Sequence, residues 1–387
     1  MQAVIGDGVR VESLRTSPFP RDEESVDEPV EDLDEVNEVI PFTYSITSYG
    51  ADYPVDSLVD RLRKEDVLIP KFSWNQSEAT GIEGFQREYV WTRSTADRFI
   101  ESLLLGLPVP GIFLFKQDKS SPSLVLDGYQ RLFTLLSYYD GMINGKEYCL
   151  DKVQEPYKGK RYGNLDVGDR RRLDDSIIHA IIIRQDEPTN DQSSIYSIFE
   201  RLNRGGVNLQ PQEIRVALYH GEFVRVLQKL NEKEAWRKLY GKKSTRLKDM
   251  EMILRFFALL YDSSQYRSPM KDFLNRYMAS NQSLQRQSEE ELVRIFDKTT
   301  QAILMGIGDK AFRPKSTLNA AVVDSLMVGV AKRLTKGGIK DNRNFREKFD
   351  ALMKNADYLS AIRTWTSEEI KVRDRLTEAE AAFSQVP

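Results

Sequence analysis

The chain has 387 residues, of which 30% are charged and 40% hydrophobic, and its formal net charge is −3. This composition is that of a soluble globular protein, and the length suffices for two domains with their own cores. No apolar run approaches the roughly 20 residues that a membrane-spanning helix needs, and the N-terminus lacks the pattern of a secretory signal. A single cysteine, Cys149, excludes an internal disulfide, so we expect a cytoplasmic protein.

The charge is unevenly distributed along the chain. Residues 1–40 carry twelve acidic and three basic side chains, a net of −9, which leaves +6 for the remainder. With few apolar residues, this segment is expected to be an acidic flexible tail. It is either simply solvated, or an electrostatic mimic that occupies a basic groove until nucleic acid displaces it.

The first folded segment is expected to begin with a strand, followed by a helix from about Val55 to Lys64 and a second strand that ends at Pro70. Phe85 to Phe115 comes next. Phe99, Ile100, Leu103, Leu104 and Leu107 give this segment the apolar face of a helix, with Ser94 or Thr95 as its N-cap, and the strand GIFLF follows.

A polar pair, Gln86-Arg87, precedes that helix among large aromatic residues. A partly desolvated arginine needs an anionic partner. The partner is either a bound ligand or a carboxylate of the protein itself.

The stretch from Val125 to Leu135 is the pattern most typical of a binding turn. An apolar strand ends at Asp127-Gly128, and leucines at helical spacing follow. Asp127, Gln130 and Arg131 would then lie at the N-terminus of a helix, where anions are favoured, and Gly128 would let a ligand approach the backbone. The alternative is that Asp127 only caps the helix while Arg131 pairs with a surface carboxylate.

Another apolar strand is expected at Ile177–Arg184; it contains His179, which we interpret as a core residue. Two helices follow, SSIYSIFERLNRGG and PQEIRVALYHG, joined by a turn at Asn203–Gly206. This turn is either a second anion site or an ordinary helix–helix connection.

The motifs IPKF, FQREYVW, FIESLLLGLPVPGIFL, VLDGYQRLFTL and FERLNRGGVNLQPQEIRVAL occur in the order of one bacterial family. Between about Tyr44 and about Met278 the chain resembles the N-terminal domain of GmrSD-type modification-dependent restriction endonucleases and related phage-defence proteins. The sequence departs from the family pattern twice. Tyr129 replaces the first glutamine of the DGQQR signature, and the segment from Ser73 to Gly84 separates two motifs that usually lie closer together.

The resemblance implies an α+β chain, in which a ParB/sulfiredoxin-like mixed α/β domain (41–230) is followed by an all-helical domain (231–387). It also implies that the chain binds, and as an NTPase hydrolyses, a nucleoside triphosphate. The catalytic residues would be Asp127, Gln130 and Arg131. The nucleotide-binding residues, three of which match the family's LN-x-x-G-x-x-L-x-x-x-E pattern, would be Gln86, Arg87, Gly128, Asn203, Gly206 and Glu213.

From Leu230 onward the pattern is helical, with helices expected at about 249–262, 269–279, 287–306, 317–334, 343–356 and 366–383. The stretch from Glu200 to Lys248 carries twelve basic and five acidic side chains, a net of +7. It is a candidate DNA track or an ordinary solvated helix surface. The residues expected to contact DNA are Lys242, Lys243, Arg246 and Trp236.

The sequence lacks the residues that several kinds of catalytic or metal site require. The chain has two separated histidines, one cysteine and no phosphate-binding P-loop, so a zinc site, an HNH nuclease module and a P-loop NTPase are not expected. Hydrolysis would depend on arginine clamps, a carboxylate and Mg²⁺ as cofactor. The alternative function is a DNA-binding or adaptor module with an inactive nucleotide pocket. Candidate partners are DNA, a separate effector nuclease or defence-system subunit, and a second copy of the chain; no membrane is expected.

Overall fold

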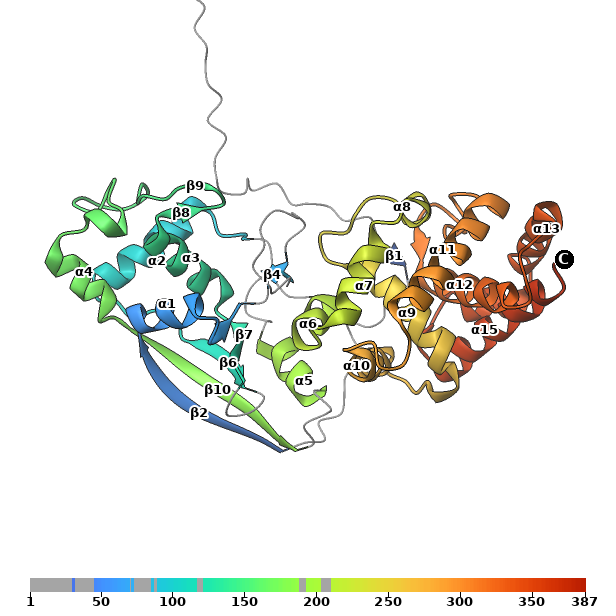
Figure 1. Cartoon of the computed structure of the whole chain (residues 1–387), viewed down its shortest axis with the longest axis horizontal. Coiled ribbons are helices and arrows are strands. Elements are labelled where there is room, and N and C mark those ends of the chain that lie inside the picture. Colours follow the sequence, from blue (N-terminus) through green and yellow to red (C-terminus); the bar gives the residue numbers. More distant parts are fainter. Residues whose placement is uncertain are drawn as a thin grey trace, which may run out of the picture.

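The computed structural model describes residues 30–31, 45–69, 71–72, 85–86, 89–116, 121–187, 193–202 and 210–387. Figure 1 shows a part that contains a β-sheet, formed by the first half of the chain, beside a helical part formed by the second half. The predicted α+β chain, with a mixed sheet followed by a helical region, is confirmed.

The sheet has five strands in the order β2-β10-β6-β7-β3. Strand β10 pairs antiparallel with β2 and parallel with β6, while β7 pairs antiparallel with β6 and parallel with β3. The bounds are β2 (Ser45–Pro54), β3 (Val67–Leu68), β6 (Ile112–Lys116), β7 (Ser123–Asp127) and β10 (Ile177–Glu187). Two-residue strands are β1 (Val30–Glu31), β4 (Lys71–Phe72), β5 (Phe85–Gln86), β8 (Met142–Ile143), β9 (Lys146–Glu147) and β11 (Leu318–Asn319).

The two faces of the sheet belong to different hydrophobic cores because successive side chains of a strand point to opposite sides. Val125 and Ile182 pack with the helices of the first part, whereas their neighbours Leu126 and Ile183 pack with the helices of the second part. The helices of the first part are α1 (Val55–Arg63), α2 (Arg93–Leu104), α3 (Tyr129–Asp140) and α4 (Val167–Asp174), with the short 3-10 helix η2 (Tyr162–Asn164).

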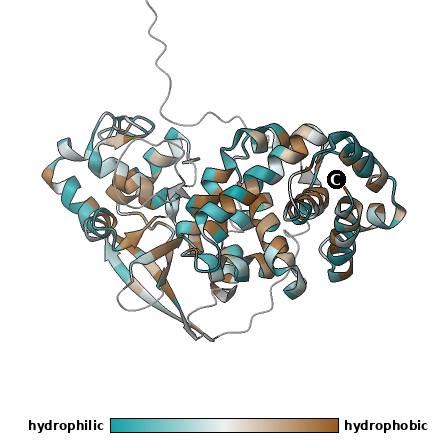
Figure 2. Cartoon of the chain, turned by 45° about the vertical axis from the view of Figure 1, so that its right-hand side comes forward, coloured by the Kyte–Doolittle hydropathy of each residue, from teal (hydrophilic) through white to brown (hydrophobic). Residues whose placement is uncertain are grey.

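The second core is built almost entirely from helices, whose apolar residues face one another (Figure 2). These helices are α5 (Ser193–Leu202), α6 (Pro211–Leu218), α7 (Glu222–Asn231), α8 (Glu234–Tyr240), α9 (Lys248–Asp262), α10 (Met270–Asn281), α11 (Glu289–Gly306), α12 (Ala320–Leu334), α13 (Asn342–Leu352), α14 (Ala356–Ala361) and α15 (Glu369–Ser384), with the 3-10 helix η4 (Ser263–Gln265). Helix α12 is buried along nearly its whole length. None of the described helices is both long and apolar enough to cross a membrane.

Most of the expected elements are present, and the differences have local causes. The helix expected at 343–356 ends at Leu352, and a further helix that was not expected, α14, begins after Asn355, which accepts hydrogen bonds from the backbone N–H groups of Asp357 and Tyr358. Helix α2 begins after Thr92, whose hydroxyl accepts from the Thr95 N–H, so the expected N-cap was misplaced by two or three residues.

Two further expectations were wrong. His179 is not a core residue: its side chain is 72% exposed, and its Nδ1 lies 2.6 Å from Oδ1 of Asp52, which faces it on β2. Within the acidic segment 1–40, Val30 and Glu31 are not a solvated tail but form β1, which pairs in parallel with β11.

A buried ion network joins three helices of the second core. The Asp324 carboxylate accepts from Arg255 Nη2 at 2.7 Å and from Arg375 Nη2 at 2.8 Å. All three side chains are at most 2% exposed. Burial opposes the charge of Asp324, but the two guanidinium groups outweigh it and lower the pKa of this carboxyl below its ordinary value.

Candidate functional site

The turn between β7 and α3 has the geometry expected from the sequence. Strand β7 ends at Asp127, Gly128 has a φ of +104°, and α3 begins at Tyr129. A Cβ at Gly128 would lie 2.4 Å from Cγ2 of Ile112, so this position needs glycine both for its backbone angle and for space. The N-cap residue Gly128 has no side chain that could cap α3, and the carboxylate of Asp127 just before it pairs with Arg131.

Arg131 lies on the first turn of α3 and points back to the strand ends. Its Nη2 donates to Asp127 Oδ2 at 2.8 Å and to the Gly111 carbonyl oxygen at 2.9 Å. Its Nε is buried and has no hydrogen-bond partner in the part of the chain that the structure describes. The carboxylate that pairs with Arg131 is therefore Asp127, four residues earlier on the same turn, rather than a distant surface residue.

Gln130 connects this turn to the motif that carries the polar pair. Its Oε1 accepts hydrogen bonds from the backbone N–H groups of Val90 at 3.2 Å and Trp91 at 3.3 Å. Tyr89 adds a hydrogen bond of 2.7 Å to Thr134 and packs its ring 5.0 Å from that of Phe133. The segment 89–91 is thus held against α3, although some 40 residues separate the two in the sequence.

Gln130 and the neighbouring Tyr89 and Tyr129 are all buried, at most 8% exposed. Tyr129, which replaces the family's glutamine, is buried, and its ring lies 5.9 Å from that of Phe133. Burial raises the pKa of the Tyr89 hydroxyl far above its usual range, so this tyrosine stays neutral. The side-chain amide of Gln130 is therefore shielded from water, and the loss of one of its hydrogen bonds is costly.

We predict that Gln130→Ala lowers the free energy of unfolding by about 1–3 kcal/mol, because two backbone N–H groups lose their acceptor. Gln301→Ala on the exposed surface of α11 is the matched control and should change this free energy by at most about 0.5 kcal/mol. Urea denaturation measures both. Equal values for the two variants would contradict the assigned contact.

Other residues expected at the site are only partly visible. Arg87, Asn203 and Gly206 lie outside the described residues. Gln86 belongs to β5, which pairs antiparallel with β4, and the structure gives no account of its side chain. The convergence of Arg87 with Arg131 therefore remains a prediction. The backbone contributions of Gly111, Val90 and Trp91 were not expected. Only Gly111 has a signal in the sequence, a glycine just before a strand.

The contacts of Glu213 hold helix α6 in place. Its Oε2 accepts from the backbone N–H of Gln210 at 2.6 Å, which caps α6, and lies 3.0 Å from Arg246 Nη2. Two residues on, the fully buried Arg215 donates to Glu251 on α9 at 3.1 Å. Helix α6 is thereby fixed to the helical core directly after the segment 203–209.

The candidate DNA track differs from its expectation. Trp236 was expected to stack on bases, but it is fully buried: its Nε1 donates to Asn231 Oδ1 at 2.9 Å, and its ring packs on Phe296. This part of the prediction is wrong, because Trp236 lies on the core-facing side of a short amphipathic helix. Lys243 pairs with Glu232 and Arg246 with Glu213, whereas Lys242 is exposed and forms no ion pair with any described residue.

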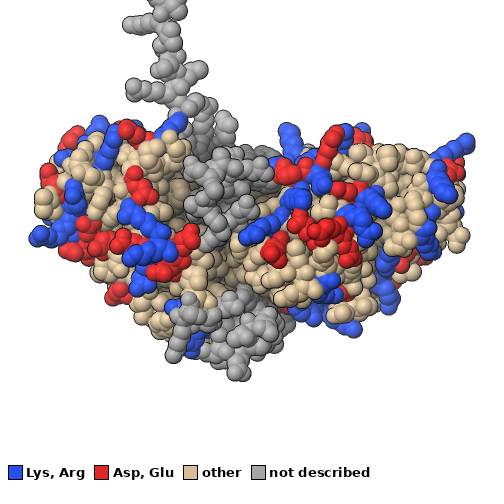
Figure 3. Space-filling model, viewed as in Figure 1, with Lys and Arg blue, Asp and Glu red and all other residues tan. Residues whose placement is uncertain are grey.

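Charge is distributed evenly over the face shown in Figure 3, where acidic and basic side chains alternate on both parts of the molecule. Among the described residues no group of three or more His, Cys, Asp or Glu side chains is placed to hold a metal ion. At the turn after β7, the carboxylate available for such an ion is that of Asp127, whose side chain is 36% exposed.

Residues 71–220 match the family described as the GmrSD restriction endonuclease, N-terminal domain. The match confirms the family that the ordered motifs indicated, and it includes both the turn after β7 and the segment held by Gln130. No curated protein and no solved structure matches the chain.

Proposed function

We propose that this chain, a GmrSD-type N-terminal domain over residues 71–220, is the nucleoside-triphosphate-binding component of a restriction or anti-phage system. The observation that carries the proposal is the arrangement of Asp127, Gly128 and Arg131. It combines an uncapped helix N-terminus with a guanidinium group that still has an unused donor. Anions, and phosphate groups above all, are favoured at such a place.

In this proposal Arg131 is the phosphate clamp. Its buried Nε has no partner among the described residues, so a phosphate oxygen that accepted this N–H would remove the cost of leaving it unpaired. The Nη2 bond to Asp127 keeps the guanidinium group oriented until a ligand arrives. Gln130 becomes a positioning residue, because its carbonyl oxygen is committed to Val90 and Trp91.

Arg87 is the proposed second clamp. It precedes Tyr89 by two residues, and Tyr89 is fixed to Thr134 on α3. The anchoring of 89–91 limits how far Arg87 can lie from the phosphate site. Asn203 and Gly206 complete the proposal as residues that contact the nucleotide from the turn before α6.

Mg²⁺ could bind at this turn only if the triphosphate supplied some of its oxygen ligands. Mg²⁺ is commonly held by one or two carboxylates together with substrate phosphates and water. Asp127 supplies one carboxylate, of which Oδ2 faces Arg131 and Oδ1 is left for a metal-bound water. With the triphosphate bound, the ion would shield its charge, and Asp127 would hold the water that attacks in hydrolysis.

We predict that GTP, CTP or ATP with Mg²⁺ raises the melting temperature of the wild-type chain and that Arg131→Ala abolishes this rise. Ligand at one hundred times its Kd stabilises the folded state by about 2.7 kcal/mol, which a thermal-shift assay resolves easily. Arg63→Ala, which removes an exposed arginine paired with Asp140, is the control and should keep the full shift.

Titration calorimetry decides the outcome. If none of the three nucleotides binds the wild type, the proposal fails. Binding that is the same in Arg131→Ala would place the nucleotide elsewhere. The DNA-binding alternative would instead be favoured by salt-dependent DNA binding that ignores nucleotide and is weakened by Lys242→Glu with Lys243→Glu.

A further inference from the structure

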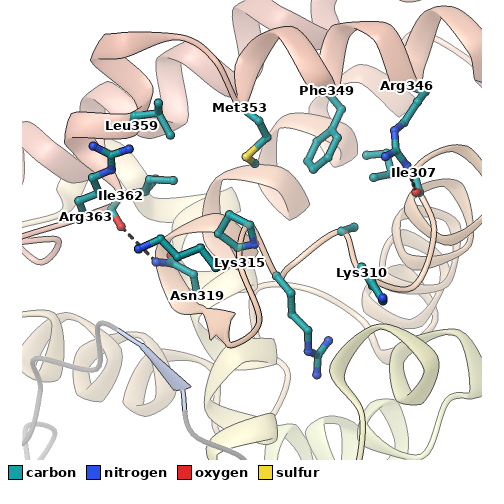
Figure 4. Close-up of a pocket in the computed structure, with 13 residues that line it drawn as sticks. Ile307, Lys310, Lys315, Asn319, Arg346, Phe349, Met353, Leu359, Ile362 and Arg363 are labelled. Carbon is teal, nitrogen blue, oxygen red and sulfur yellow. Dashed lines mark hydrogen bonds between the residues drawn. The ribbon is translucent and has the colours of Figure 1, made fainter.

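A cavity of about 840 Å³ lies in the helical part, between α13, α14 and the loop that joins α11 to β11. One wall is apolar: Phe349 of α13 and Met353, the residue after this helix, point into it, and Leu359 and Ile362 continue this wall (Figure 4). The other lining side chains include five cations and no carboxylate. The cations are Lys310, Arg313, Lys315, Arg346 and Arg363.

Three of these cations have no counter-ion among the described residues. Arg346 donates to the Ile307 carbonyl oxygen and pairs with Asp350, and Arg313 donates to the Leu239 carbonyl oxygen at 2.7 Å. Lys310, Lys315 and Arg363 are exposed, and none of their side chains forms an ion pair or a hydrogen bond with a described residue. Cations gathered around a hollow concentrate positive potential there and favour an acidic occupant.

The edge of this cavity is already paired with the N-terminal segment. Strand β1 pairs in parallel with β11, with Val30 opposite Leu318 and Glu31 opposite Asn319. Asn319 lines the cavity and holds β11 rigidly, since its Nδ2 donates to the Ile362 carbonyl oxygen at 3.1 Å and its Oδ1 caps α12.

The polarity of the β1–β11 pair shows at which end of β11 the residues before Val30 enter. Parallel strands run in the same direction, so the residues that precede one strand lie at the same end of the pair as the residues that precede the other. The loop before Leu318 carries Lys310 and Lys315, and the sequence before Val30 carries five carboxylates within seven residues. These are Asp22, Glu23, Glu24, Asp27 and Glu28.

We propose that the cavity is the docking site of this chain's own acidic segment, residues 22–28. Its carboxylates neutralise Lys310, Lys315 and Arg363, and Val26 between them contacts the apolar wall. The pairing of β1 with β11 tethers the segment beside the cavity, so docking needs little further ordering of the chain. While the segment is bound, other polyanions cannot bind in the cavity.

Zero-length carbodiimide cross-linking of the full chain tests the contact directly, because it joins only carboxylates and amines that already touch. Mass spectrometry should find Asp27 or Glu28 joined to Lys315 or Lys310. Lys64 and Lys158 are exposed lysines of the first part and serve as internal controls that should not be joined to residues 22–28. Equal cross-linking to all four lysines, or none to Lys310 and Lys315, overturns the proposal.

Proteolysis of charge variants gives an independent readout. With Lys315→Glu and Arg363→Glu, cleavage after the acidic residues of 22–28 by a glutamate-specific protease should become roughly tenfold faster. The pair Lys64→Glu and Lys158→Glu changes the net charge equally and should leave the rate unchanged. Adding Asp27→Lys and Glu28→Lys to the first pair should restore protection at Glu23 and Glu24, which remain cleavage sites in every variant.

Two results count against the proposal. Cleavage that is equally fast in the wild type and both paired variants means that the segment does not dock. If a single-stranded oligonucleotide binds the wild type through Lys315 and Arg363 without changing that cleavage rate, the cavity is a nucleic-acid site instead.

Discussion

Asp324→Ala is expected to destabilise the chain by about 3–5 kcal/mol, the cost of leaving buried charges without their partner. The substitution strands two guanidinium groups, those of Arg255 and Arg375, which are at most 2% exposed and both bond to this carboxylate. Because α9, α12 and α15 meet at this residue, the loss should appear as a single cooperative shift of the urea transition.

The control for this prediction is an ion pair at the surface. Glu347→Ala removes the exposed partner of Arg343 and should change stability by at most about 1 kcal/mol. A loss of similar size in both variants would show that the buried network contributes no more than the exposed pair.

The same network predicts a pH dependence. The pKa of Asp324 is lowered in the folded chain from its ordinary value of 3.8, so its contribution is complete at neutral pH and is lost as the pH falls through the folded pKa. The wild-type melting temperature should therefore fall below about pH 4 as Asp324 becomes protonated, whereas this carboxyl adds no pH dependence above that pH. The difference between wild type and Asp324→Ala should narrow there and stay constant above it.

Gly128→Ala is expected to cost about 2–5 kcal/mol, the second largest effect. An alanine in the left-handed region costs about 1–2 kcal/mol by itself, and overpacking against a core side chain adds about 1–3 kcal/mol. Here the new methyl group would lie 2.4 Å from Cγ2 of Ile112.

The same helix provides the matched control. Gly141 ends α3 with a φ of +69° and has open space where a Cβ would stand, so Gly141→Ala should cost only the backbone part. Denaturation curves of both variants separate the two contributions. Equal losses would mean that Ile112 moves aside freely and that the turn after β7 is less tightly packed than described.

The turn after β7 could be predicted because its signals are local. Asp127 ends an apolar strand, Gly128 permits the left-handed backbone, and leucines at helical spacing follow at once. The ion pair from Arg131 to Asp127 is likewise a contact within four residues. The hydrogen bonds of Gln130 could not be predicted, because its partners are backbone groups some 40 residues earlier.

His179 and Trp236 show why local composition misleads. His179 stands in an apolar run, yet strand alternation turns it to the exposed face beside Asp52. Trp236 stands among lysines and arginines, but the short helix α8 presents these charges to solvent and the indole to Phe296 and Phe312. In both cases the exposure of the side chain depends on which helix or strand packs against its own element. The local sequence does not reveal that neighbour.

Adjacent residues of β7 serve different halves of the molecule. Leu126 is 3% exposed within the helical core, while Asp127, next along the chain, holds Arg131. A tightly packed leucine cannot follow its neighbour without disturbing what surrounds it. Because β7 also contacts α5, we expect a ligand that displaces the Asp127 carboxylate to alter the packing of β7 against this helix as well.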